Sequence, residues 1–167
     1  MAVKRQMIVF RIGVEEFATD INIAKEIVVM RPITAIPETR DFVEGVMNLR
    51  GNLIPVLDLR KRLRAAHADG HQQVRIIIAT LDGKQTGLIV DGASEVIRVS
   101  DEMVEPVPDV ISEIGADYVL GVINMSNRFI TLVDLDKVLL GEVRHELDEV
   151  MRALARPAGG VLEEAGV

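Results

Sequence analysis

The sequence predicts a mainly β protein made of two copies of one small β unit. Residues 45–63 align without a gap on residues 121–139, and eight of the 19 aligned positions are identical. Upstream, residues 11–28 align on residues 80–97 at a constant offset of 69, whereas the offset between the two later segments is 76. Both copies consist mostly of short segments rich in Val, Ile and Leu that end at Gly, Asn or Asp. This pattern is typical of strands joined by turns.

The duplication restricts how the chain can fold. A single copy, below about 80 residues, would have a marginal hydrophobic core, and a period near 70 residues is too long for a solenoid repeat. We therefore expect copies 7–63 and 76–139 to pack against each other and to exchange strands. Residues 1–155 are expected to form a single domain of two β subdomains, followed by a flexible C-terminal tail, residues 156–167.

Composition excludes several classes of function. The net charge of −7 argues against nucleic acid or anionic lipid as a main partner. The absence of Cys excludes disulfides, thiol catalysis and Cys-ligated metal. No apolar run reaches the roughly 18 residues of a membrane span, so we expect no direct membrane insertion. Residues 1–12 lack the apolar core of a signal peptide, which predicts a cytoplasmic location.

In the first copy, residues 7–12 are rich in β-branched side chains and predict a strand. Residues 13–16 predict a turn, after which residues 17–23 can re-enter the sheet. Residues 24–30 are mostly apolar and predict a strand, or a short helix that leads into one. Two prolines, Pro32 and Pro37, then favour extended backbone because proline and the residue before it disfavour helix.

The repeated segment predicts a hairpin followed by a short helix. A strand at residues 46–49 leads to a turn at 50–52 and a return strand at 53–57. The second copy supports the turn, because Asn127 replaces Gly51, and Asn and Gly best tolerate left-handed backbone angles.

Each return strand ends in Asp-Leu, with Asp58 in one copy and Asp134 in the other. Two acids at matching positions raise the idea of a catalytic pair, but a simpler role suffices for both. An Asp just before a short helix caps it by accepting a backbone N–H. We therefore expect Asp58 and Asp134 to be helix N-caps.

The rest of the second copy is predicted along the same lines. Residues 74–81 and 86–91 predict a hairpin around the turn pair Asp82 and Gly83, and residues 121–139 repeat the turn, strand and short helix. Apolar side chains at helical spacing then predict a C-terminal helix over residues 142–155.

One cluster could hold a metal ion. His67, Asp69 and His71 alternate along a polar loop, which leaves open a small metal-dependent hydrolase. No further ligand lies nearby in the sequence, so a solvated loop is the simpler interpretation. Phosphate-binding loops and nucleophile elbows are absent from the sequence, and we expect no cofactor.

Several segments resemble the CheW family, the adaptors of bacterial chemosensory arrays. The motif Asn-Leu-Arg-Gly at 48–51, followed by Ile-Pro-Val-Leu-Asp-Leu-Arg at 54–60, is similar to the signature of that family. Further similar segments span about residues 6–140: the strands from 10 to 27 with their terminal Glu-Ile, residues 87–92, 106–108 and 118–121. The kinase CheA and the fused adaptor CheV carry related domains, but the additional domains of both are absent from this sequence.

The resemblance implies two intertwined five-stranded barrels of the SH3-like type, with short helices. It also implies a non-enzymatic scaffold that couples the cytoplasmic tip of a methyl-accepting chemoreceptor to a CheA-type histidine kinase. Recruitment to membrane-associated receptor arrays would then occur through these partners. A CheW paralogue that serves a pilus or surface-sensing pathway is the alternative within the same class.

The family's receptor contact, carried over to matching positions, implies Arg50, Glu26, Asn48 and Val46 as receptor-binding residues, and it leaves the kinase-binding surface unknown. The repeat adds an independent argument, because Ser126 replaces Arg50 in the second copy and the turn therefore does not require Arg. Two roles for Arg50 remain open: contact with the receptor, or a structural ion pair with Glu26. The sequence also departs from the family pattern at Ala18 and Ala24, where Gly and a larger apolar residue are usual.

Overall fold

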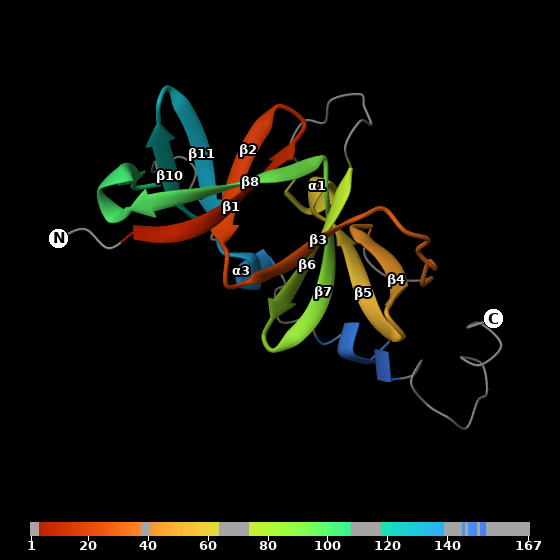
Figure 1. The fold of residues 1–167 in the computed structure, drawn as a ribbon. Coiled ribbons are helices and arrows are strands. Elements are labelled where there is room, and N and C mark those ends of the chain that lie inside the picture. Colours follow the sequence, from red (N-terminus) through yellow and green to blue (C-terminus); the bar gives the residue numbers. More distant parts are fainter. Residues whose placement is uncertain are drawn as a thin grey trace.

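The computed structural model of the chain describes residues 4–37, 41–63, 74–107 and 118–138, together with residues 145, 147–149 and 151–152. Within these residues the fold is mainly β, with two sheets and only short helices (Figure 1). The division into one domain, 1–155, and a tail, 156–167, stays a prediction, because the tail lies outside the described residues.

The strands and helices follow the two copies in turn. The first copy contributes β1 (Lys4–Ile12), β2 (Glu15–Asp20), β3 (Ala24–Val29), β4 (Val43–Leu49), β5 (Asn52–Asp58) and helix α1 (Leu59–Leu63). The second contributes β6 (Arg75–Leu81), β7 (Lys84–Val90), β8 (Gly92–Ser100), the 3-10 helix η1 (Asp101–Met103), β9 (Val104–Glu105), β10 (Val119–Met125), β11 (Arg128–Val133) and α3 (Leu135–Val138). The segment 24–30, for which the sequence left two possibilities, is a strand.

The two copies exchange their first hairpins. One sheet has the order β3-β6-β7-β5-β4, and the other has the order β8-β1-β2-β11-β10-β9. Under the repeat alignment, β1 to β5 correspond to β6, β7, β8, β10 and β11, so the two orders are the same pattern. Each sheet combines the first two strands of one copy with the later strands of the other. The expectation of two intertwined barrels is confirmed.

Each sheet closes through the segment that follows its edge strand. Thr34, beyond the end of β3, exchanges two backbone hydrogen bonds of 2.8 and 2.9 Å with Val46 on the opposite edge strand β4. In the other sheet, β9 follows β8 through η1 and pairs with β10 in the same way. The second sheet has six strands because this closing segment is itself a short strand.

The closure explains the repeated glycines at the start of the aligned segments. A Cβ atom at Gly45 would lie 1.9 Å from the carbonyl oxygen of Thr34, and one at Gly121 would lie 2.7 Å from Val104 and 2.8 Å from the oxygen of Glu105. Both glycines also mark a bulge in the register of their hairpins. Only a residue without a side chain allows the closing segment to approach this closely.

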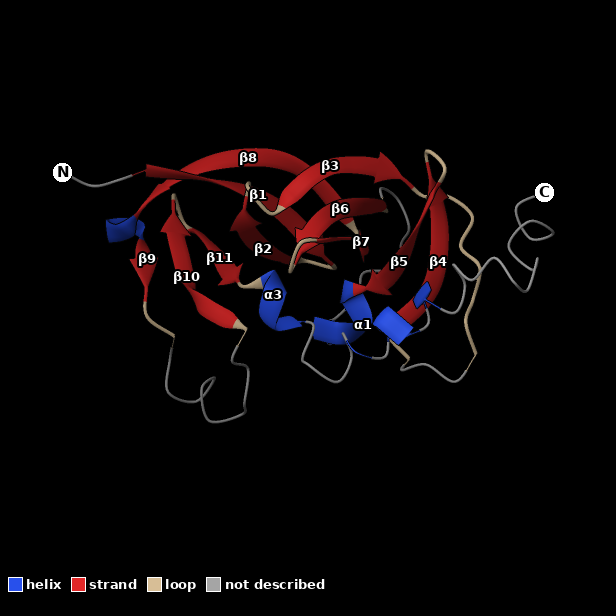
Figure 2. Cartoon of the chain, turned by 90° about the horizontal axis from the view of Figure 1, so that it is seen from below, coloured by secondary structure: helices blue, strands red, loops and turns tan. Residues whose placement is uncertain are grey.

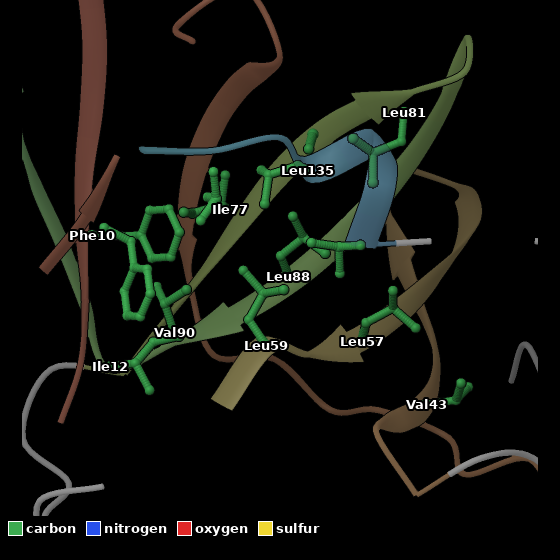
Figure 3. Close-up of a cluster of buried hydrophobic side chains, with 14 of the residues drawn as sticks. Phe10, Ile12, Val43, Leu57, Leu59, Ile77, Leu81, Leu88, Val90 and Leu135 are labelled. Atoms are coloured by element: carbon green, nitrogen blue, oxygen red, sulfur yellow. The ribbon is translucent and has the colours of Figure 1, made fainter. Parts of the chain in front are cut away.

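Buried side chains form three clusters, one inside each barrel and one between the barrels. The central cluster draws on both sheets and both short helices, with Phe10 of β1, Leu59 of α1 and Leu135 of α3 all fully buried (Figure 3). The rings of Phe10 and Phe17 stack within this cluster, with their centres 5.6 Å apart. The barrels therefore share one core, as the small size of each copy requires.

The predicted turns and caps are present. Residues Arg50 and Gly51 have φ angles of 50° and 88°, and their counterparts Ser126 and Asn127 have 48° and 65°. Positive φ at both turn positions is the type I′ geometry that suits a two-residue hairpin. The N-cap prediction is also confirmed: the backbone N–H groups two residues further on donate to Asp58 and Asp134, at 2.9 and 3.0 Å.

The predicted C-terminal helix is visible in its described part, where residues 145, 147–149 and 151–152 are helical. Leu147 is only 4% exposed and joins the central core. Figure 2 shows α1 and α3 between the two barrels, on one side of the molecule. Among the described residues, no helix is long and apolar enough to cross a membrane.

Candidate protein-interaction site

Arg50 lies at the tip of the β4–β5 hairpin, where the turn holds it out from the barrel. The side-chain oxygen of Asn48 accepts the backbone N–H of Gly51 at 2.8 Å. This bond stabilises the turn, because the side-chain oxygen of an Asn can accept a backbone N–H in place of a backbone carbonyl. The backbone of Arg50 is therefore held by its neighbours, whereas its side chain is 60% exposed.

The guanidinium of Arg50 meets the carboxylate of Glu26 on β3. Its two terminal nitrogens donate to the two oxygens of Glu26, at 3.1 and 2.5 Å, in the bidentate arrangement that Arg favours with carboxylates. These hydrogen bonds hold the pKa of the Glu26 carboxyl below its ordinary value, and the charges of Arg50 and Arg31 act in the same direction. The pKa of Arg50 is raised in turn.

The exposure of this pair bears on the two roles that the sequence left open for Arg50. The structural ion pair exists, but the Glu26 side chain is 34% exposed and that of Arg50 more so. Water screens such a pair, and exposed pairs contribute little to folding stability. The pair therefore orients the guanidinium at the surface and leaves it accessible to a partner.

The other predicted contact residues occupy different places. Asn48 is exposed and lies on the same hairpin as Arg50. Val46 is 5% exposed, and its backbone closes the barrel through Thr34. The side chain of Val46 is therefore buried beneath the hairpin, and its predicted role in receptor binding stays a prediction. The structure brings Arg50, Glu26 and Asn48 to one surface, and their role in receptor binding stays a prediction.

A second Arg–Glu cluster, which the sequence reasoning missed, lies at the corresponding place on the other barrel. Glu95 takes the place of Glu26 in the second copy, and it pairs with Arg128 at 2.8 Å. Arg128 also reaches Glu16 at 2.6 Å. The hydrogen bond from Arg128 lowers the pKa of Glu95. The aligned glutamates could have revealed this cluster, but its Arg lies two positions past the turn residue that corresponds to Arg50.

A third charged group is more buried and was also missed. Asp58, only 2% exposed, accepts hydrogen bonds from Nε and a terminal nitrogen of Arg60, both at 3.0 Å. Arg60 also reaches Asp91 at 3.1 Å, and Asp91 accepts the backbone N–H of Gly13 at 2.7 Å. This group ties α1 to the ends of β1 and β7, so its role is to join elements of the two copies.

A metal site is one of the alternatives that the sequence left open. Within the ranges that the structure describes, no group of three or more His, Asp or Glu side chains could hold a metal ion. The alternative site at His67, Asp69 and His71 lies outside the described residues.

Known proteins resemble this chain over most of its length. The family model of the CheW-like domain matches residues 6–142. The chain belongs to the CheW family. Its fold agrees with the crystal structure of the scaffolding protein CheW from Thermoanaerobacter tengcongensis, with a TM-score of 0.76 and 35% sequence identity, over 84% of this chain and 96% of that one.

Curated CheW proteins match over most of their length. A probable chemotaxis protein CheW of Rhizobium etli is 36% identical over 85% of this chain and 91% of its own length. The chemotaxis protein CheW of Klebsiella aerogenes is 30% identical over 90% of this chain and 91% of its own length. The resemblance seen in the sequence motifs is thereby confirmed, as is the assignment of a chemotaxis scaffold with a CheW-like domain.

Proposed function

We propose that this CheW-family protein is a non-enzymatic adaptor that couples chemoreceptors to a CheA-type histidine kinase. Membership of a family whose named members are chemotaxis and scaffolding proteins supports the class of function. The observation that best supports a contact with the receptor is the exposed, oriented guanidinium of Arg50. It lies at a turn position where the second copy has Ser126. The hairpin tolerates both residues, so the Arg serves something other than the turn.

The ion pair with Glu26 suits a binding role. Arg carries five N–H donors, and Glu26 engages one on each terminal nitrogen. The remaining donors stay available to a partner's carboxylate or carbonyl oxygens. Because Glu26 already restricts the side chain, less conformational entropy is lost when a partner binds. Asn48 provides a further exposed amide on the same hairpin.

The proposal also specifies where the adaptor acts and which of its surfaces are separate. The adaptor acts in the cytoplasm and reaches membrane-associated receptor arrays only through its partners. Receptor and kinase bind at separate surfaces, because an adaptor must hold both at once. We expect affinities of roughly micromolar for each, about −8 kcal/mol.

The test is a reconstituted assay with receptor-containing membranes, a CheA-type kinase and the adaptor. The Arg50→Ser variant places in the first turn the residue that the second turn already carries. We expect it to lose at least about tenfold in receptor-dependent control of the kinase, which corresponds to about 1.4 kcal/mol. Kinase binding, measured separately, should survive. Arg128→Ser, which removes the related cluster on the other barrel, is the matched control and should keep receptor control.

Two results would contradict the proposal. If Arg50→Ser kept full receptor control, the contact would lie elsewhere. If receptor tip and kinase fragment competed strictly for the wild-type protein, one molecule could not bridge them.

A further inference from the structure

Two surface grooves occupy corresponding places on the two barrels. The first, of about 550 Å³, lies at the starts of β5 and β7 and includes Leu53 and Lys84 in its lining. The second, of about 420 Å³, lies at the starts of β11 and β2 and includes Phe129 and Glu15. Under the repeat alignment, Phe129 matches Leu53 and Glu15 matches Lys84. The grooves are therefore the same site of one repeated fold.

The C-terminal helix covers the first groove. Leu147 and Met151 of that helix line it from the side opposite the strands. Asp148 of the helix forms an ion pair with Lys84 at 2.6 Å. An amphipathic helix thus lines this site with apolar side chains one helical turn apart, and its Asp148 carries a charge opposite to that of Lys84.

The second groove is open. Phe129 is 65% exposed and Val14 is 82% exposed, both far more than large apolar side chains inside a barrel core. Its described lining comes from strands and turns alone, with no helical residue. The residues that align on Met151 and Arg152 of the C-terminal helix are Arg75 and Ile76, which belong to strand β6.

The charge of the open groove differs in sign from that of the covered one. Glu15 stands where Lys84 stands in the covered groove, and no ion pair joins it to any described residue. Arg128 at the same groove is already engaged by Glu16 and Glu95. Glu15 therefore presents an uncompensated carboxylate beside the exposed ring of Phe129.

We propose that the groove between β2 and β11 is a docking site for an amphipathic helix of a partner protein, one that carries a Lys or Arg beside its apolar stripe. The covered groove shows that this site of the fold accepts a helix, and Glu15 sets the charge of the occupant. This surface is separate from the hairpin that carries Arg50, and the inference does not rest on the proposed receptor contact.

The charge also argues against a second copy of this chain as the occupant. If the C-terminal helix of another molecule entered the open groove as it enters its own, Asp148 would face Glu15. Two carboxylates that face each other repel, whereas a basic side chain in place of Asp148 would be attracted to Glu15.

The chain supplies its own probes for a test. A synthetic peptide with the sequence of residues 142–155 represents the native helix, and the same peptide with Asp148→Lys represents the proposed occupant. Each is titrated into the ¹⁵N-labelled full-length protein, and amide shifts locate the binding. We expect the Lys peptide to shift the amides of Val14, Glu15 and Phe129, and to bind at least about threefold more tightly than the native peptide.

Variants of the protein make the test specific. Glu15→Lys should reverse the preference between the two peptides, and Phe129→Ser should abolish binding of the Lys peptide. Val29→Ser, which removes another exposed apolar side chain, 58% exposed on β3, should leave binding unchanged. The proposal would be overturned if the Lys peptide at millimolar concentration left the groove amides unshifted, or if Glu15→Lys changed neither affinity. Self-association of the protein that Phe129→Ser abolishes would identify a second copy as the occupant and would also overturn it.

Discussion

The guanidinium of Arg62 on α1 donates a hydrogen bond from Nε to the carbonyl oxygen of Val138 on α3, at 3.1 Å. Val138 holds the same position in the second copy that Arg62 holds in the first. The guanidinium also lies over the rings of Phe42 and Tyr118, 5.6 and 5.4 Å from their centres, and these two aromatic residues are repeat-related as well. One side chain from the first copy thus contacts equivalent points of both copies.

Replacing Arg62 should therefore loosen the joint between the copies. Arg62→Ala removes two cation–π contacts and one hydrogen bond, at a cost of about 2 kcal/mol. We expect Tm, measured by calorimetry, to fall by about 6 °C. Arg62→Lys should recover only part of the loss, because an ammonium lacks the planar surface that stacks on rings. Lys137→Ala, an exposed residue on α3, is the control and should leave Tm unchanged; an equal drop there would refute a specific role for Arg62.

Barrel closure predicts that the two repeated glycines are sensitive to the smallest substitution. Gly45→Ala would drive a methyl group into the backbone of Thr34, so we expect a loss of more than about 3 kcal/mol in denaturant unfolding. Gly121→Ala meets a movable side chain as well as a backbone oxygen and should cost roughly 2 kcal/mol. Gly51→Ala meets no atom within 4 Å and should cost only the strain of its positive φ, about 1 kcal/mol. A Gly45→Ala protein as stable as Gly51→Ala would exclude close contact at the closure.

The pairing of Glu26 predicts a pH dependence that NMR can follow. Its pKa lies below the ordinary 4.5, first because of the hydrogen bonds from Arg50. The stability that the pair supplies is therefore present at neutral pH, and it is lost as pH falls through the lowered pKa of the folded state. In Arg50→Ser, the Glu26 carboxyl should titrate closer to its ordinary value, while Glu95 keeps its lowered pKa through Arg128. An unchanged Glu26 titration would show that the pair does not persist in solution.

The strand exchange predicts that neither half of the chain folds alone. Residues 1–71 contain β1 and β2, whose neighbours in the sheet are β8 and β11 of the second copy. We expect the separate fragments 1–71 and 72–167 to give poorly dispersed amide spectra and no cooperative melt. Mixed or co-expressed, they should recover the spectrum of the intact chain. A cooperative melt of either fragment by itself would contradict the intertwined arrangement.

Much of the fold could be predicted from local sequence signals. The turn at Arg50 and the caps at Asp58 and Asp134 depend on residues only a few positions apart, and the duplication supplied a second example of each. The exchange of strands was expected only in general terms. Which hairpin joins which barrel depends on pairings between residues far apart in the chain, and local patterns contain no information about these.

The candidate site was predictable in part. The motif around Arg50 identified the hairpin, and Glu26 was considered as the partner of Arg50. The exposure of this pair depends on how the barrel closes around it, which the sequence does not reveal. Arg62 stacks on two rings, those of Phe42 and Tyr118, that lie far apart in sequence, so no local pattern indicates these contacts. The Arg128 cluster was missed because its Arg does not align with Arg50. When the partners of a side chain come from separate strands, they lie at no regular spacing along the sequence, and a sequence pattern cannot reveal them.

The exchange of hairpins also sets an order for folding during synthesis. The barrel that contains β4 and β5 has all its strands once β7 has left the ribosome. The other barrel must wait for β11, about 40 residues later, which is a few seconds at the usual rates of translation. During that interval β1 can pair with β8, which is complete at Ser100, but the outer edge of β2 and the apolar side chains of the hairpin remain exposed to other chains until β11 is made. The amino-terminal hairpin, although made first, is therefore the part of the nascent protein most in need of a chaperone.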